Sequence, residues 1–210
     1  MTLFPEPPPT PSKAWLEAKG ESSDVKEVEK FIRGYSYGDP HTAVVTDEKL
    51  CTFVLDELAK TQERFFNMIE LVFELQKESY ISKDLETLKR QVEAFVTQLK
   101  VRSCQWKGIT AAFYLRLIKT DLQLIQGAQK LQASAALLEQ KLLEHVKRPE
   151  YIQKYPKTWR NTLALVPVIH KQIRQLVVTF ADREAICNIR PIDLDRTYEA
   201  LQEEIRAKYE

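Results

Sequence analysis

The stretch VLDELAKTQERFFNMIELVFEL, from Val54 to Leu75, decides the fold of this chain. Its mainly apolar stripe recurs at alternating steps of four and three residues, through Val54, Leu58, Thr61, Phe65, Met68, Val72 and Leu75. This spacing keeps one stripe of a helix facing a neighbouring helix. The stripe is widened by Phe66, Ile69, Leu71 and Phe73, so we expect contacts with two or more neighbours in a bundle.

Long helices are also expected further along the chain. No proline occurs in the 108 residues from His41 to Arg148, and proline costs about 3 kcal/mol inside a helix. The spacing continues in a second phase through Leu85, Leu88, Val92, Phe95, Leu99, Trp106, Ile109 and Phe113, and in a third through Leu124, Ala128, Leu131, Ala135, Leu138 and Leu142. A phase shift indicates either a turn or a stutter within one helix.

The two phase shifts are interpreted differently. At 81–84 we predict a turn with Ser82 as the helix cap. Between 103 and 117 both alternatives stay open: one helix over 83–147 would measure about 98 Å, whereas a break near Gly108 gives two antiparallel helices.

The sequence therefore predicts an all-α protein, an elongated antiparallel bundle that is coiled-coil-like with long helices. Residues 1–11 form a disordered Pro-rich tail, residues 12–45 hold two short helices and a loop with Ser12 as the first cap, and residues 46–210 form the bundle, whose first helix is capped by Thr46 or Asp47. Thr158 caps a later helix, which Pro167 kinks and which packs through Trp159, Leu163, Val166, His170, Ile173, Val177 and Phe180. A last helix is expected over 194–209.

Charge is strongly segregated along the chain. Residues 1–93 carry 12 basic and 18 acidic side chains, residues 94–174 carry 14 and 4, and residues 175–210 carry 5 and 8. The overall charge of +1 therefore hides a middle block at +10. Two interpretations remain open. The block neutralises acidic helices within the bundle, where each exposed pair adds less than about 1 kcal/mol, or it attracts something acidic.

A basic surface of this kind binds an acidic protein, anionic lipid or nucleic acid. The candidate partner-binding or anion-binding face comprises Lys147, Arg148, Lys154, Lys157, Arg160, Lys171 and Arg174, with the interleaved Tyr151 and Tyr155. We expect a non-catalytic interaction or scaffold protein, an adaptor or subunit of a cytoskeletal or trafficking assembly that presents residues 94–174 to an acidic protein partner. The alternative is a dimeric bundle that binds anionic membrane, and nucleic-acid binding is a remote third.

Sequence patterns typical of catalysis or metal binding are absent. The Glu-x-x-His pattern of helical metal bundles does not occur, and Cys51, Cys104 and Cys187 include no Cys-x-x-Cys pair for zinc. His41 is interpreted as a solvated turn residue, His145 as a positive imidazole that complements the dipole at a helix end, and His170 as a packed core residue. We therefore predict no enzyme activity, no cofactor and no metal site.

The amino-terminal tail holds one short motif. Thr10-Pro11-Ser12-Lys13 fits the preference of proline-directed kinases, which makes Thr10 a candidate phosphorylation site. No secretory signal is visible, and no window approaches the roughly 18 to 20 apolar residues that a membrane span requires. We expect a cytoplasmic protein, with the nucleus as the alternative location.

Overall fold

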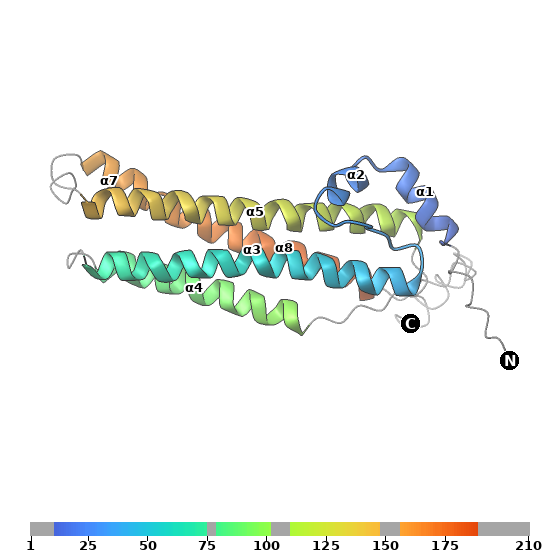
Figure 1. Cartoon of the computed structure of the whole chain (residues 1–210), viewed down its shortest axis with the longest axis horizontal. Coiled ribbons are helices and arrows are strands. Elements are labelled where there is room, and N and C mark those ends of the chain that lie inside the picture. The colour runs from blue at the N-terminus through green and yellow to red at the C-terminus, as the bar shows by residue number, and fades with distance from the viewer. Residues whose placement is uncertain (1–10, 75–78, 102–109, 148–155, 189–210) are drawn as a thin grey trace, which may run out of the picture.

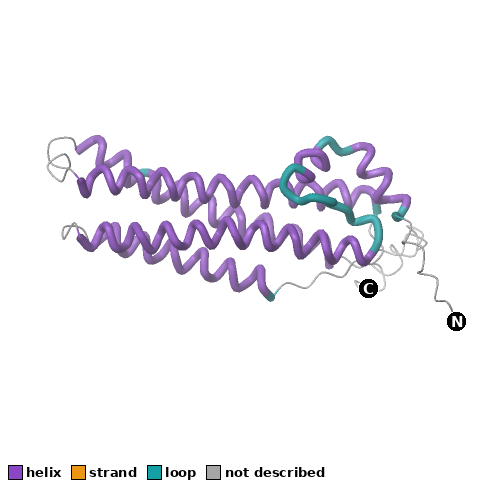
Figure 2. Tube along the Cα trace, in the orientation of Figure 1, coloured by secondary structure: helices purple, strands orange, loops and turns teal. Residues whose placement is uncertain are grey.

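The structure of the protein is a computed structural model that describes residues 11–74, 79–101, 110–147 and 156–188. Helices account for nearly all of these residues, and none of them lies in a strand (Figures 1 and 2). The helices are α1 (Lys13–Glu21), α2 (Asp24–Glu29), α3 (Pro40–Glu74), α4 (Ser79–Lys100), α5 (Ala111–Lys147), α7 (Pro156–Leu163) and α8 (Leu165–Asn188). The prediction of a helical-bundle-like all-α fold is confirmed.

The long helices lie side by side, and successive ones run in alternating directions (Figure 1). Helix α5 packs against α3 on one side and α8 on the other, while α4 packs against α3 and, less extensively, against α8. The short helices α1 and α2 lie on α5 at the end of the molecule where α3 begins. Helix α7 lies at the opposite end, against α5 and α8.

The predicted stripes form the main core. The side chains of Val54, Leu58, Thr61, Phe65, Met68 and Val72 are all buried, as are those of Leu85, Leu88, Val92, Phe95 and Leu99 on α4 and Leu124, Ala128, Leu131, Ala135, Leu138 and Leu142 on α5. Leu75, Trp106 and Ile109 lie outside the described residues, and Phe113 is half-buried. Each fully buried Leu or Phe stabilises the fold by about 1.5–3 kcal/mol, so these stripes are the main source of stability.

The widening of the first stripe was only partly predicted. Ile69 and Leu71 are half-buried, but Phe66 and Phe73 are 52% and 85% exposed. At 100° per residue, Phe66 and Phe73 each lie one step around α3 from the buried Phe65 and Val72, which places them beyond the contact with α4. The ring of Phe66 contacts the Lys89 ammonium instead, at 6.0 Å.

Helix α3 begins six residues earlier than predicted, at Pro40 rather than after a cap at Thr46 or Asp47. Asp39 is the cap, because its Oδ1 accepts hydrogen bonds from the backbone N–H groups of His41 and Thr42, both at 3.0 Å. The hydrogen bonds from Thr42 are the main cause of the lowered pKa of Asp39. Proline suits the first helical position since its missing N–H has no partner there. His41 is therefore exposed as expected, but on a helix.

Two other helix starts also differ from prediction. Helix α4 begins at Ser79, so Ser82 lies inside its first turn and residues 81–84 are helical. Helix α7 begins at Pro156, so Thr158 lies within it and does not cap it. The open alternative over 83–147 is decided: α4 ends at Lys100 and α5 begins at Ala111, which makes two helices.

Pro167 breaks the helix that it was predicted to kink. Helix α7 ends at Leu163, Ala164 is a turn residue, and α8 begins at Leu165. Proline has no N–H to donate to the carbonyl of residue 163, and its ring clashes with that turn. The break changes the helical phase, so the buried residues of α8 are Ile169, Ile173, Leu176 and Phe180, while Val166, His170 and Val177 are only half-buried. The predicted helix over 194–209 lies outside the described residues.

The amino-terminal helices are held on the bundle by a cap and a close contact. Ser12 caps α1 as predicted, since its hydroxyl accepts from the Trp15 N–H at 3.3 Å. The Ser12 N–H donates to the Gly38 carbonyl at 2.7 Å. A Cβ at Gly38 would lie 2.8 Å from Pro11 and 3.0 Å from Trp15, so only glycine permits this approach.

Candidate functional site

The predicted basic face is exposed wherever the structure describes it. Lys147 ends α5, Lys157 and Arg160 lie on α7, and Lys171 and Arg174 lie on α8; all five side chains are exposed. Arg148, Lys154, Tyr151 and Tyr155 lie outside the described residues, as does Thr10. Four of the five residues therefore belong to the two helices that meet at Ala164, at the end of the molecule far from α1 and α2.

Ion pairing differs sharply between the two parts of the chain. Among the described residues before position 94, the paired basic side chains are Lys13, Lys19, Lys30, Lys60, Arg64, Lys89 and Arg90. From 94 to 174 the described basic residues are Lys100, Arg116, Lys119, Lys130, Lys141, Lys147, Lys157, Arg160, Lys171 and Arg174, and none of them forms an ion pair. In the described part of the chain, the basic block does not neutralise acidic helices through direct pairs.

A second charged cluster lies inside the protein, and sequence analysis missed it. Arg183 on α8 and Asp121 on α5 are both 0% exposed, and Arg183 Nε donates to Asp121 Oδ1 at 2.5 Å. Arg183 Nη1 lies 2.7 Å from Oδ1 of Asp47 on α3. Three long helices are thus joined by one guanidinium and two carboxylates.

Two tyrosines from the segment between α2 and α3 complete this cluster. The hydroxyls of Tyr35 and Tyr37 donate to Asp121 Oδ2 at 2.7 and 2.6 Å, and Arg183 Nη2 donates to the Tyr37 hydroxyl at 3.0 Å. We call Tyr35, Tyr37, Asp47, Asp121 and Arg183 the buried charge cluster. Its hydrogen bonds compensate the several kcal/mol per ion that desolvation costs.

The buried surroundings keep the cluster in one protonation state. Burial raises the pKa of both tyrosines well above the usual value, and the charge of Asp121 raises it further, so both hydroxyls remain donors. Burial by itself would lower the pKa of Arg183, but Asp121 raises it more, and the net shift is upward. The guanidinium stays positive and the tyrosines stay neutral, so the cluster acts as a fixed structural clamp.

Aromatic packing encloses this clamp. The Trp15 ring of α1 makes edge contacts with Tyr35, Tyr37 and Tyr114, at centroid distances of 6.0, 5.8 and 5.5 Å. Thr46 also holds the segment, since its hydroxyl donates to the Ser36 carbonyl at 2.7 Å. The amino-terminal helices are therefore part of the folded protein and shield the clamp from water.

The opposite end has a simpler buried polar contact. His145, in the last turn of α5, is buried; its Nε2 lies 3.1 Å from Thr162 Oγ1 and its ring makes an edge contact with Trp159 at 5.0 Å, both on α7. Burial is the main cause of the lowered pKa of His145. The prediction of a positive imidazole on a helix end is corrected: desolvation favours the neutral ring over the charged one.

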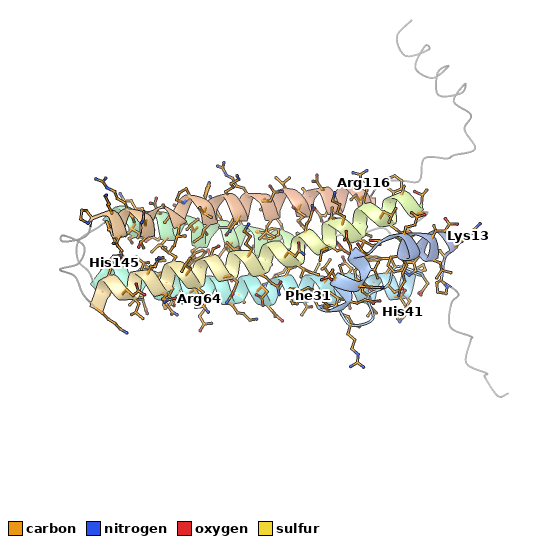
Figure 3. The ribbon with its side chains drawn as sticks, turned by 90° about the horizontal axis from the view of Figure 1, so that it is seen from above. Lys13, Phe31, His41, Arg64, Arg116 and His145 are labelled. Carbon is orange, nitrogen blue, oxygen red and sulfur yellow. The ribbon has the colours of Figure 1, made fainter. Side chains whose placement is uncertain are left out.

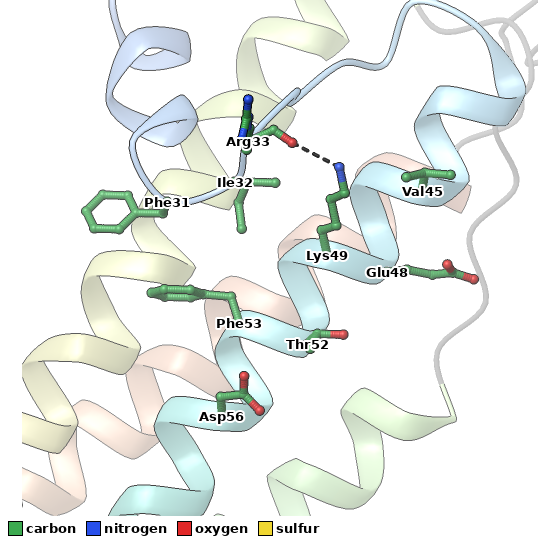
Figure 4. Close-up of a pocket in the computed structure, with 9 residues that line it drawn as sticks. All are labelled: Phe31, Ile32, Arg33, Val45, Glu48, Lys49, Thr52, Phe53 and Asp56. Atoms are coloured by element: carbon green, nitrogen blue, oxygen red, sulfur yellow. Dashed lines mark hydrogen bonds between the residues drawn. The ribbon is translucent and has the colours of Figure 1, made fainter.

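Two surface grooves border α3. One, of about 520 Å³, lies between α3 and the turn after α2, where Lys49 Nζ donates to the Arg33 carbonyl at 2.9 Å and Phe31 packs on Phe53 at 5.7 Å (Figure 4). The other, of about 490 Å³, lies between α3 and α5, and the Arg64–Glu139 ion pair crosses it. Each mixes acidic, basic and apolar side chains, so neither selects a ligand of one charge.

The remaining candidate chemistry is sparse in the described residues. No group of three or more His, Cys, Asp or Glu side chains there could hold a metal ion. Cys51 and Cys187 are buried free thiols, Cys104 lies outside the described residues, and His170 is half-buried. Among the described helices, none is long and apolar enough to cross a membrane.

Comparison with known proteins gives no family for this chain: no family model, no curated protein and no solved structure matches it. The functional argument therefore depends on the chain's own residues.

Proposed function

We propose that this chain is a non-catalytic helical scaffold or adaptor, a subunit of a cytosolic cytoskeletal or trafficking assembly, which presents a basic face to an acidic protein partner. Its elongated antiparallel bundle, coiled-coil-like in packing, holds that face rigid. The observation that carries the proposal is the set of exposed, unpaired cations on α7 and α8: Lys157, Arg160, Lys171 and Arg174. Cations of this kind steer and orient an oppositely charged partner.

The amino-terminal end supports the same proposal. There the ionisable groups that converge are enclosed and hydrogen-bonded to one another, which is the arrangement of a structural clamp. A catalytic site needs such groups to reach a substrate. A rigid frame with its charges exposed at the far end suits binding.

Charge reversal on α7 tests the proposal. Full-length protein and the double variant Lys157→Glu/Arg160→Glu are used as baits in affinity purification with mass spectrometry. We expect a set of acidic proteins to be captured by the parent protein and lost with the double variant. The matched control is Lys26→Glu/Lys83→Glu, which reverses two described basic residues without ion pairs before position 94. Equal capture by parent and double variant would contradict the proposal.

Vesicle sedimentation separates the membrane alternative. Phosphatidylcholine vesicles with and without phosphatidylserine are mixed with the same proteins. We expect no sedimentation with either. Sedimentation that requires phosphatidylserine and disappears with Lys157→Glu/Arg160→Glu would replace the adaptor proposal by a membrane-binding bundle.

A further inference from the structure

Helices α5 and α8 lie against each other in a register fixed by three contacts. Arg183 bonds Asp121, Gln172 Nε2 donates to Ser134 Oγ at 3.0 Å, and a Cβ at Gly127 would lie 2.7 Å from Leu176. Each step up α5 corresponds to a step down α8, so the helices are antiparallel. One turn beyond the Ser134–Gln172 contact, Leu137 is level with Val168.

Leu137 and Val168 form an apolar pair on the outer edge of this seam. They are 43% and 46% exposed, while their sequence neighbours Leu138 and Ile169 are fully buried. Adjacent residues on a helix are 100° apart, so a buried Leu138 beside an exposed Leu137 places the latter at the rim. Val178, 53% exposed, lies three turns further along α8.

The charges around the pair are nearly all of one sign. On α5, Lys130 is exposed and Lys141 half-buried, and on α8 Lys171 is exposed. The carboxylate of Glu139, in the same stretch, faces α3 and is held there by Arg64 and Asn67. Lys130 and Lys141 are about 16 Å apart along the axis, the length of three helical turns. We call Leu137, Val168, Lys130, Lys141 and Lys171 the α5/α8 rim.

We infer that the α5/α8 rim docks an acidic amphipathic helix of the partner protein. Apolar residues of that helix cover Leu137 and Val168, and carboxylates on its flanks pair with the three lysines. This inference rests on the proposed function and names the partner's chemistry. A bilayer is a poorer occupant because helices that lie in membranes bury Trp, Phe or Leu residues along one face, and the rim has one leucine and one valine.

A displayed peptide library tests the inference. The probes are helical 18-residue peptides with four randomised apolar-face positions and glutamates fixed on both flanks, selected against full-length protein. A second library has lysines at the flanks. We expect enrichment from the glutamate library alone. The best peptide, measured by fluorescence anisotropy, should bind at least tenfold more weakly to Leu137→Ser/Val168→Ser and to Lys130→Glu/Lys171→Glu.

Matched controls locate the binding on this rim. Phe73→Ser removes a more exposed apolar side chain from α3, and Lys100→Glu reverses an exposed cation at the end of α4. Both should bind the peptide within twofold of the parent protein. Failure to enrich glutamate-flanked peptides, or equal binding by the rim variants, overturns the inference.

The outcomes also separate this inference from the proposed function. Lys157→Glu/Arg160→Glu tests capture of the cellular partner, whereas the peptide tests the rim on purified protein. Partner loss with an indifferent rim overturns the rim inference alone. Peptide binding at the rim without partner loss from α7 overturns the α7 proposal. Binding to phosphatidylserine vesicles that depends on Leu137 and Val168 overturns the helix as occupant.

Discussion

The two ends of this molecule bury polar groups in different ways. At the α1/α2 end, Asp47, Asp121 and Arg183 carry full charges, and the two tyrosine hydroxyls complete their hydrogen bonds. At the α7 end, one imidazole and one threonine hydroxyl share a contact, and neither needs a charge. Figure 3 shows the separation: His145 is near one end of the long axis, whereas Lys13 and His41 are near the other.

The difference teaches where specificity is built into a helical protein. A buried charge without its partners costs several kcal/mol, so the clamp tolerates only one arrangement of α3, α5, α8 and the amino-terminal segment. The His145–Thr162 contact involves neutral groups and joins only α5 and α7. We therefore expect the first end to be the more sensitive to substitution.

The largest expected effect is that of Arg183→Met. It leaves Asp47 and Asp121 buried without their cation and should lower the free energy of unfolding by about 3–5 kcal/mol. At about 2–4 °C per kcal/mol, the Tm should fall by roughly 6–20 °C in a thermal unfolding measurement.

Two further variants check the cause of that loss. Arg174→Met, at an exposed site on the same helix, should stay within about 0.5 kcal/mol of the parent. Adding Asp121→Asn to Arg183→Met should recover part of the loss, because it removes one of the two orphaned charges. A loss below about 1 kcal/mol for Arg183→Met would mean that the clamp is not essential.

A middle-sized effect is expected from removing the tyrosine hydroxyls. Tyr35→Phe and Tyr37→Phe each delete a hydrogen bond to a charged carboxylate, worth about 1.5–3 kcal/mol. Tyr37→Phe should cost more, because its hydroxyl also accepts from Arg183. Urea unfolding measures both, and Tyr114→Phe, in the same aromatic cluster, is the control. Equal losses for all three would assign the effect to packing and not to the clamp.

The smallest effect is a pH dependence at the α7 end. The pKa of His145 is lowered in the folded protein, so between that value and 6.5 the unfolded chain binds more protons than the native one. The stability is present above pH 6.5 and is lost as the pH falls below it, with a slope of at most about 1.4 kcal/mol per pH unit. Urea unfolding at pH 7.5 and 5.5 measures the change.

Substitution of the histidines identifies the group responsible. His145→Gln should remove the pH-dependent component, whereas His41→Gln, exposed at the other end, should leave it unchanged. Glu144 and Lys141 act on the His145 pKa in opposite directions, and neither outweighs burial. An unchanged slope in His145→Gln would contradict this assignment.

Local signals allowed much of the fold to be predicted. The stripe from Val54 to Val72 and the cap at Ser12 both follow from side-chain spacing and hydrogen-bonding chemistry within one helix. Prediction failed where two local signals compete. Asp39-Pro40 was interpreted as a turn although the same pair starts a helix, and the break at Ala164 changed the phase of α8.

The clamp did leave a signal in the sequence. Asp121 is four residues after Leu117 and three before Leu124, and Arg183 is three after Phe180, so both charges occupy stripe positions. Asp47, four residues before Cys51, does the same on α3. Opposite charges at core positions of different helices could have indicated a buried pair. Tyr35 and Tyr37, in a turn, gave no such periodic signal.

The sequence by itself determined which segments are helical and which stripe of each helix is apolar, because these depend on residues within a few turns of one another. Only the tertiary structure decided that Asp47, Asp121 and Arg183 meet, and that Leu137 is level with Val168. Those contacts depend on how helices far apart in the chain align, which is set by the combined burial of every stripe and by the requirement that each buried charge find its partner.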